Sequence, residues 1–170
     1  IGEDDFVKLA NLHKDFEWLT DEPNALFELW GLTEKTECKE LIEHLIRSFF
    51  YVDGTVLKRS SIDLAARIEE VWKLEPSNTY LTATCDESAP DGSQSLVQTL
   101  KNKFSCDWKE VNFYNSLPVA TYKIKDDFNL ILVDDFIGTG NTIKRKVEYV
   151  RKVISQRELK NVSVFVITIA

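Results

Sequence analysis

The feature that most constrains the fold is the stretch 129–147, which reads NLILVDDFIGTGNTIKRKV. An apolar run ends in two adjacent carboxylates, a loop with two glycines and two threonines follows, and the pattern then becomes helical. A further apolar run, VSVFVITIA, occupies 162–170. Strand, loop, helix and strand in this order predict a βαβ unit of a parallel sheet. Because both strands are continuously apolar, we expect helices on both faces of that sheet.

The hydrophobic periodicity changes near residue 76 and divides the chain into two predicted regions. Residues 1–75 predict an N-terminal helical region, because apolar residues recur there near a 3.6-residue period. Residues 76–170 predict an α/β core. The predicted fold class is therefore α/β, a parallel sheet with flanking helices, preceded by the N-terminal helical region. We expect the core to be incomplete at its C-terminus, because the sequence stops within an apolar run.

Within the core, the alternation of apolar and polar residues predicts individual elements. Strands are expected at 79–85, 108–116, 129–135 and 162–170, and helices at 95–104 and 143–158. The segment LPVATYKIKDD at 117–127 is interpreted as a connection or a short hairpin. In the N-terminal region, Ser60 or Ser61 is expected to cap the last helix, SIDLAARIEEVWKL.

Composition excludes several classes of function. The net charge is -7, which argues against a broad nucleic-acid-binding face, because such binding needs many Lys and Arg. No apolar run approaches the roughly 18 residues of a membrane span. The three cysteines form no CxxC pair, so they predict neither a zinc cage nor a disulfide framework. A reduced, cytoplasmic location is expected.

The loop GTGNT suits an anion. Glycines allow the backbone to approach a ligand closely, and free N–H groups at a helix start attract phosphate. Threonine hydroxyls can donate further hydrogen bonds to phosphate oxygens. We therefore predict that the loop binds a phosphate monoester through Gly138, Thr139, Gly140, Asn141 and Thr142.

The acid pair Asp134 and Asp135 suits a different part of the same ligand. Carboxylates repel phosphate, but they accept hydrogen bonds from sugar hydroxyls, and one or both can share a divalent metal. A vicinal diol beside a phosphate is a ribose 5-phosphate. We therefore predict that the acids bind the ribose and the loop binds its 5-phosphate.

With these residues, LILVDDFIGTGNT resembles the phosphoribosyl pyrophosphate motif of the type I phosphoribosyltransferases. The resemblance covers about a dozen residues closely. It implies that Asp134 and Asp135 contact the ribose hydroxyls, that 138–142 surrounds the 5-phosphate, and that Mg²⁺ is bound chiefly through the substrate. Asp134 and Asp135 are thereby also the candidate catalytic and metal-binding residues. The resemblance extends to divergent phosphoribosyltransferase-like domains of bacterial conflict or antiphage gene clusters.

The sequence departs from the family pattern in two loops. The expected pyrophosphate loop reads CDESAPDGSQS, whose three carboxylates would repel pyrophosphate, although Gly92 and Ser93 at a helix start could donate to it. The expected mobile catalytic loop would be YNSLPVATYKIKDDF, which is short and has Lys123 and Lys125 as its cations.

Other interpretations of the acid pair explain less of this stretch. An exposed strand end would explain two acids but not the loop that follows. A receiver domain needs more chain after its acid pair, a haloacid-type phosphatase needs an acid where Phe136 stands, and no P-loop or complete dinucleotide fingerprint occurs.

Two functions remain open. One is an enzyme that uses phosphoribosyl pyrophosphate and Mg²⁺ to transfer the phosphoribosyl group to a nitrogen base. The other is an inactive module that senses a nucleotide or phosphoribosyl pyrophosphate and contacts a protein partner through its N-terminal helices, for instance in antiphage defence. The expected ligand is a small molecule in both cases.

Overall fold

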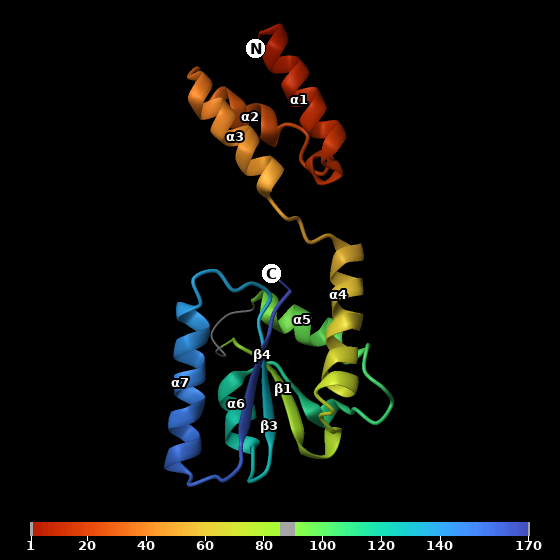
Figure 1. Cartoon of the computed structure of the whole chain (residues 1–170), viewed down its shortest axis with the longest axis vertical. Coiled ribbons are helices and arrows are strands. Elements are labelled where there is room, and N and C mark those ends of the chain that lie inside the picture. Colours follow the sequence, from red (N-terminus) through yellow and green to blue (C-terminus); the bar gives the residue numbers. More distant parts are fainter. Residues whose placement is uncertain (1, 86–90, 170) are drawn as a thin grey trace. The chain divides into compact units, whose positions relative to one another are not determined.

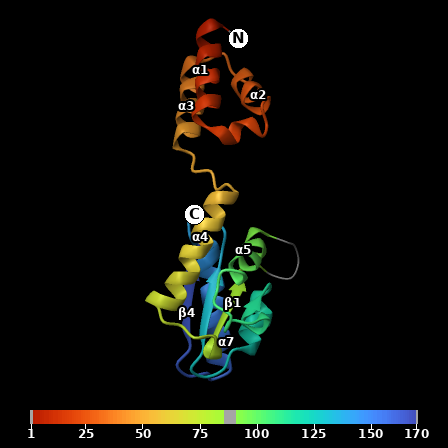
Figure 2. The ribbon, with the colours of Figure 1, turned by 90° about the vertical axis from the view of Figure 1, so that its right-hand side faces the viewer.

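The computed structural model describes residues 2–85 and 91–169, and the chain forms two compact units, Ile1–Asp53 and Gly54–Ala170. The first unit contains three α-helices and a short 3₁₀ helix, Glu17–Thr20 (Figure 2). The α-helices are α1 (Glu3–Asp15), α2 (Ala25–Gly31) and α3 (Thr36–Ser48).

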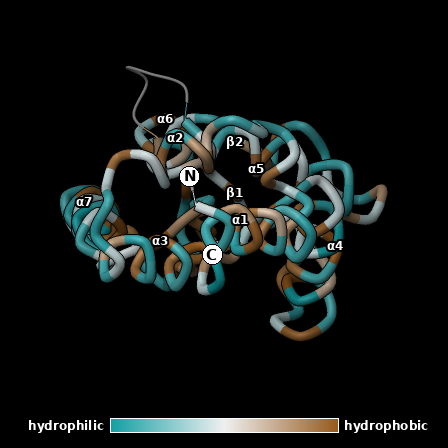
Figure 3. Tube along the Cα trace, turned by 90° about the horizontal axis from the view of Figure 1, so that it is seen from above, coloured by the Kyte–Doolittle hydropathy of each residue, from teal (hydrophilic) through white to brown (hydrophobic). Residues whose placement is uncertain are grey.

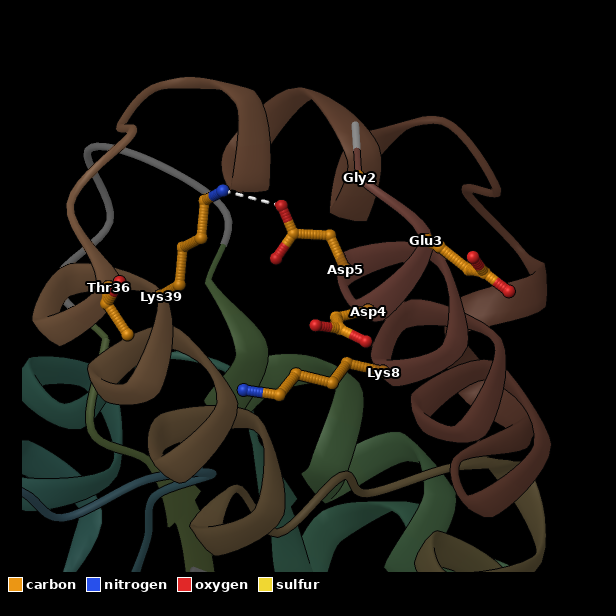
Figure 4. Close-up of a pocket in the computed structure, with 7 residues that line it drawn as sticks. All are labelled: Gly2, Glu3, Asp4, Asp5, Lys8, Thr36 and Lys39. Carbon is orange, nitrogen blue, oxygen red and sulfur yellow. Dashed lines mark hydrogen bonds and ion pairs between the residues drawn. The ribbon is translucent and has the colours of Figure 1, made fainter.

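The helices of the first unit enclose a small core of their own. Its buried residues are Leu9, Leu12, Leu19, Leu26, Trp30 and Ile46. At the start of α1, the ammonium of Lys39 on α3 donates to the carboxylate of Asp5 at 2.6 Å (Figure 4). This hydrogen bond lowers the pKa of Asp5. The contact ties α3 to α1 across the rim of an acid-rich cavity.

The second unit is built on a four-stranded parallel sheet, as the sequence predicts. Its strand order is β2–β1–β3–β4, and each neighbouring pair is parallel. The strands are β1 (Thr79–Ala83), β2 (Phe113–Tyr114), β3 (Asn129–Val133) and β4 (Ser163–Ile167). The α/β fold class with preceding N-terminal helices is therefore confirmed.

Helices cover both faces of this sheet (Figure 1). The side chains of β3 alternate: Ile131 and Val133 belong to one buried cluster, and Leu130 and Leu132 belong to the other. The first cluster is completed by residues of α5 (Gly92–Lys101) and by Ile68, in the π-helical turn Arg67–Val71 that continues α4 (Gly54–Ala66). The second is completed by α6 (Leu117–Lys123) and α7 (Asn141–Gln156).

The segment 117–127 differs from its prediction. It contains the helix α6 rather than a hairpin or an open connection. Pro118 lies in the first turn of this helix, where its missing N–H costs nothing, and Leu117, Ala120 and Ile124 are fully buried against the sheet. The segment expected to hold the mobile catalytic loop therefore contains a helix that packs as part of the core.

Two predicted boundaries also move. The helix α4 begins at Gly54, before the expected cap at Ser60 or Ser61, and Ser61 lies buried inside it with its hydroxyl donating to the Leu57 carbonyl at 2.7 Å. Through its contacts with α5, this helix belongs to the second compact unit. The division into compact units thus falls between 53 and 54, whereas the predicted regions were 1–75 and 76–170.

Candidate functional site

The candidate site lies where β1 and β3 end side by side. These neighbouring strands are parallel and paired in register from Thr79 with Asn129 to Ala83 with Val133, so their carboxyl ends meet at one edge of the sheet. In the order β2–β1–β3–β4, the chain leads from β1 to β2 on one side of this pair and from β3 to β4 on the other side. The pair is therefore the switch point of the sheet. Open α/β sheets bind ligands in the crevice at such a point.

Asp135, exposed just after β3, lies against the start of α5. A Cβ placed on Gly92 would come 2.5 Å from the carboxylate carbon of Asp135, so the carboxylate occupies space that only glycine leaves free. The Asp135 carbonyl accepts a hydrogen bond from Thr168 Oγ1 at 3.2 Å, which ties it to the end of β4. The structure thus brings two predicted site residues, Gly92 and Asp135, into contact.

Asp134 is half-buried beside the end of β1. Burial raises the pKa of its carboxyl, and the carboxylates of Asp135 and Asp91 raise it further, while a hydrogen bond with the Thr84 side chain acts in the opposite direction. Its backbone N–H donates to the Ile167 carbonyl at 3.0 Å. A partly desolvated carboxylate near two others favours a cation or hydroxyl donors in its surroundings.

The loop after the acid pair forms a cavity of about 340 Å³. Asp134 lines it, together with Phe136, Ile137, Gly138, Thr139, Gly140, Thr142 and Ile143. The cavity therefore brings Asp134 together with residues of the predicted phosphate loop, and the prediction that they bind one ligand stays a prediction. Asn141 and Asp135 do not line this cavity, although each adjoins residues that do.

Backbone N–H groups of the loop are available to a ligand. Within the part of the chain that the structure describes, the N–H groups of Gly138, Thr139 and Gly140 donate to no protein acceptor. Gly140 has φ 75° and precedes α7, whose N-terminus has no side-chain cap. The positive end of this helix and the free N–H groups together form an anion-binding geometry.

Ser93 has a structural contact in place of the predicted ligand contact. It is fully buried, and both its N–H and its hydroxyl donate to Asp91 Oδ1, which caps α5. Its proposed role as a donor to pyrophosphate stays a prediction. The acidic residues Asp86 and Glu87 of the predicted pyrophosphate loop lie outside the described residues.

Three residues of the site escaped sequence reasoning. Thr84 contacts the Asp134 carboxylate, Thr168 holds the Asp135 carbonyl, and the exposed ring of Phe136 borders the cavity. The threonines could be found only once the strand order was known, because each follows a strand that neighbours β3 and parallel pairing carries strand ends to one edge. The sequence gives no signal for Phe136, since an apolar residue after an acid pair is equally typical of the hydrophobic core.

The acid pair fits a magnesium ion that is shared with a ligand. Among the described residues, no group of three or more His, Cys, Asp and Glu side chains could hold a metal alone. Mg²⁺ in phosphate sites commonly takes one or two protein carboxylates and completes its shell with phosphate oxygens and water. Asp134 and Asp135 could supply those carboxylates, and their mutual repulsion would be relieved by a cation.

A parallel sheet with an acid pair and a glycine-containing loop at its switch point is consistent with a phosphoribosyltransferase-like α/β domain. The model of the PRTase-CE family matches residues 28–170, and the chain belongs to this family. The match begins within α2 and includes α3 and α4 as well as the sheet. No curated protein and no solved structure gives a significant match. The family implies a small-molecule substrate. In the described part of the chain, no helix has the length and apolar character needed to cross a bilayer.

Proposed function

We propose that the protein binds phosphoribosyl pyrophosphate or a nucleotide 5′-monophosphate where β1 and β3 end. One observation carries this proposal: Asp134 lines a single cavity together with four residues of the loop, Gly138, Thr139, Gly140 and Thr142. Ribose hydroxyls would donate to the carboxylates of Asp134 and Asp135. The 5′-phosphate would accept from the loop N–H groups and from the hydroxyls of Thr139 and Thr142.

Transfer of the phosphoribosyl group to a nitrogen base is the reaction that this arrangement favours. The bond between ribose C1 and the pyrophosphate oxygen breaks, a bond from C1 to the acceptor nitrogen forms, and that nitrogen loses a proton. Because the protein would bind the ribose through both its hydroxyls and its 5′-phosphate, C1 would be held in one orientation. The carboxylates of Asp134 and Asp135 would favour the positive charge that develops on the ring. Mg²⁺ shared by the acids and the ligand would neutralise charge on the departing pyrophosphate.

A second candidate function is an inactive sensor that contacts a protein partner through the first unit. Large apolar side chains are exposed there, and Leu41, Leu45 and Phe49 recur at four-residue spacing from α3 onward, with exposed fractions of 56%, 58% and 57%. Such a stripe is typical of an interaction surface. The resemblance to domains of bacterial conflict systems is the ground for proposing antiphage defence as the setting.

One experiment separates the two functions. Pyrophosphate release is measured with phosphoribosyl pyrophosphate, Mg²⁺ and a panel of nitrogen bases, beside calorimetric titration with the same sugar and with nucleotide monophosphates. Turnover that Asp135→Asn abolishes supports the enzyme, and binding without turnover supports the sensor. Asp107→Asn is the matched control, because Asp107 is an exposed carboxylate between α5 and β2 that does not line the cavity. If saturating ligand leaves the melting temperature unchanged, both functions are contradicted.

A further inference from the structure

A second cavity, here called the α6–α7 groove, adjoins the phosphate loop. Its volume is about 500 Å³, and it is lined by Pro118, Thr142, Arg145, Lys146 and Tyr149. Thr142 also lines the loop cavity, so this residue borders both spaces. A ligand that occupies both would have its 5′-phosphate on the loop and would extend past Thr142 into the groove.

The helices that form the groove are locally basic in an acidic protein. Together α6 and α7 carry one acidic residue, Glu148, which does not line the groove, and α7 is mostly hydrophilic in Figure 3. Their basic residues are Lys123, Lys144, Arg145, Lys146, Arg151 and Lys152. The chain as a whole has a net charge of -7. This concentration of positive charge favours an anion at the groove.

Arg145 stands at the boundary between the two cavities. Its Nη2 lies 3.5 Å from Thr142 Oγ1, and in the described part of the chain no ion pair engages it. A guanidinium recognises phosphate with two parallel N–H donors. Since the loop N–H groups suffice for one phosphate monoester, a cation one helical turn further along suits a second phosphate.

The other walls of the groove are rings. Tyr149, with an exposed fraction of 40%, and Pro118 on α6 complete the lining of the groove. The cavity is thus wider than a single phosphate group requires. A phosphate chain along Arg145 and Lys146 would fill its polar side and leave the ring-lined side accessible.

We propose that the α6–α7 groove binds a second phosphate joined to the 5′-phosphate, so that the site accepts nucleoside 5′-di- and triphosphates. This inference rests on the proposed function, because it takes the first phosphate to lie on the 138–142 loop. In this arrangement Arg145 and Lys146 contact the β-phosphate, and Thr142 lies between the two phosphates. The recognised class is then a 5′-polyphosphate in addition to a 5′-monophosphate.

The test is calorimetric titration of the full chain with AMP, ADP and ATP in the presence of Mg²⁺, with phosphoribosyl pyrophosphate as a further ligand. We expect ADP and ATP to bind about tenfold more tightly than AMP, as one added charge-assisted contact allows. The double variant Arg145→Ala/Lys146→Ala should reduce ADP and ATP to the affinity of AMP and leave AMP unchanged. The matched control is Arg151→Ala/Lys152→Ala, which removes the same charge from exposed positions of α7 outside the groove.

The outcomes separate this inference from the function on which it rests. Equal affinities for AMP, ADP and ATP overturn the inference alone, and so does binding of phosphoribosyl pyrophosphate without any binding of ADP. An equal loss of affinity for ADP and ATP in both double variants also overturns the inference, because a general charge effect would then explain the preference for ADP and ATP over AMP. If none of the four ligands binds, the proposed function and the inference both fail. Circular dichroism melting of each variant verifies that the fold is retained.

Discussion

The carboxylate of Asp135 lies directly against Gly92, so that a methyl group on Gly92 would overlap it. The two residues follow different strands, and they meet because β1 and β3 are parallel neighbours whose carboxyl ends coincide. The contact joins the loop after β1 to the acid pair after β3. It therefore connects Gly92, a predicted donor to pyrophosphate, with Asp135, a predicted ribose contact.

Gly92→Ala is expected to weaken ligand binding while leaving the fold intact. The Asp135 side chain is exposed and can rotate away from the new methyl group, so the change in the free energy of unfolding should stay within about 1 kcal/mol. A rotated carboxylate would no longer face the ribose, and the affinity should fall about tenfold. Calorimetric titration with phosphoribosyl pyrophosphate and Mg²⁺ measures the loss.

The control is Gly54→Ala at the start of α4, where an added Cβ meets no atom within 4 Å. This variant should bind as the wild type does. Unchanged affinity in Gly92→Ala would mean that the Asp135 carboxylate does not contact the ligand.

Gly140→Ala is expected to destabilise the protein. At φ 75° an alanine is strained in the left-handed region, which costs about 1 kcal/mol and corresponds to a fall in melting temperature of about 2–4 °C. Gly138→Ala is the matched loop control, because Gly140 is the only glycine with positive φ among the described residues and a Cβ on Gly138 meets only the movable ring of Phe136. Equal losses in the two variants, measured by thermal unfolding, would contradict the role of backbone strain.

Asp134→Asn is expected to raise stability at neutral pH. Because the pKa of Asp134 is raised by burial and by neighbouring carboxylates, the native state holds the proton more tightly than the unfolded chain does. The carboxyl therefore favours folding below its unfolded pKa of about 4, and this contribution is lost as the pH rises through the folded pKa. The uncharged amide avoids this loss, and solvent screening of the half-buried group limits the gain to below about 1 kcal/mol at pH 7.

The measurement for Asp134→Asn is urea unfolding of variant and wild type between pH 3.5 and pH 7. The advantage of the variant should shrink toward the acidic end of this range, where the wild-type carboxyl becomes protonated. The exposed Asp107→Asn serves as control and should stay within about 0.5 kcal/mol of the wild type. A variant less stable than the wild type at pH 7 would show that the Asp134 charge is favourable in the native state.

The parallel sheet and the cavity beside the acid pair could be predicted because their signals are local. An apolar strand, two acids and a glycine-containing loop are contiguous in the sequence, so residues 129–142 specify their own arrangement. The contact of Gly92 with Asp135 and that of Thr84 with Asp134 depend on which strands are neighbours. Strand order is set by packing of the whole sheet, and no local pattern encodes it.

The helix α6 was missed for a related reason. Its seven residues are too few to show a helical period, and Val119, Thr121 and Tyr122 individually favour strands. Tertiary contacts decide the outcome, since Leu117, Ala120 and Ile124 pack on the sheet. An isolated helix of this length would be unstable in water. Its stability must therefore come from its neighbours.

Arg157 supplies part of that stability, and Arg157→Ala is expected to loosen α6. The Arg157 guanidinium donates hydrogen bonds to three backbone carbonyls at the C-terminal end of α6, those of Thr121 at 3.0 Å, Tyr122 at 2.8 Å and Ile124 at 3.1 Å. Carbonyls at the end of a helix have no donor within the helix itself. Since Arg157 is largely exposed, removing these bonds should cost about 1 kcal/mol. Arg157→Lys should recover less than half of the loss, because a compact ammonium cannot donate to three carbonyls as a planar guanidinium does.

The control is Arg151→Ala. Arg151 is exposed on α7, and its removal should leave stability within about 0.5 kcal/mol of the wild type. Hydrogen exchange at the amides of 120–124 provides the local readout: faster exchange in Arg157→Ala than in Arg151→Ala is expected, and equal rates would contradict a capping role.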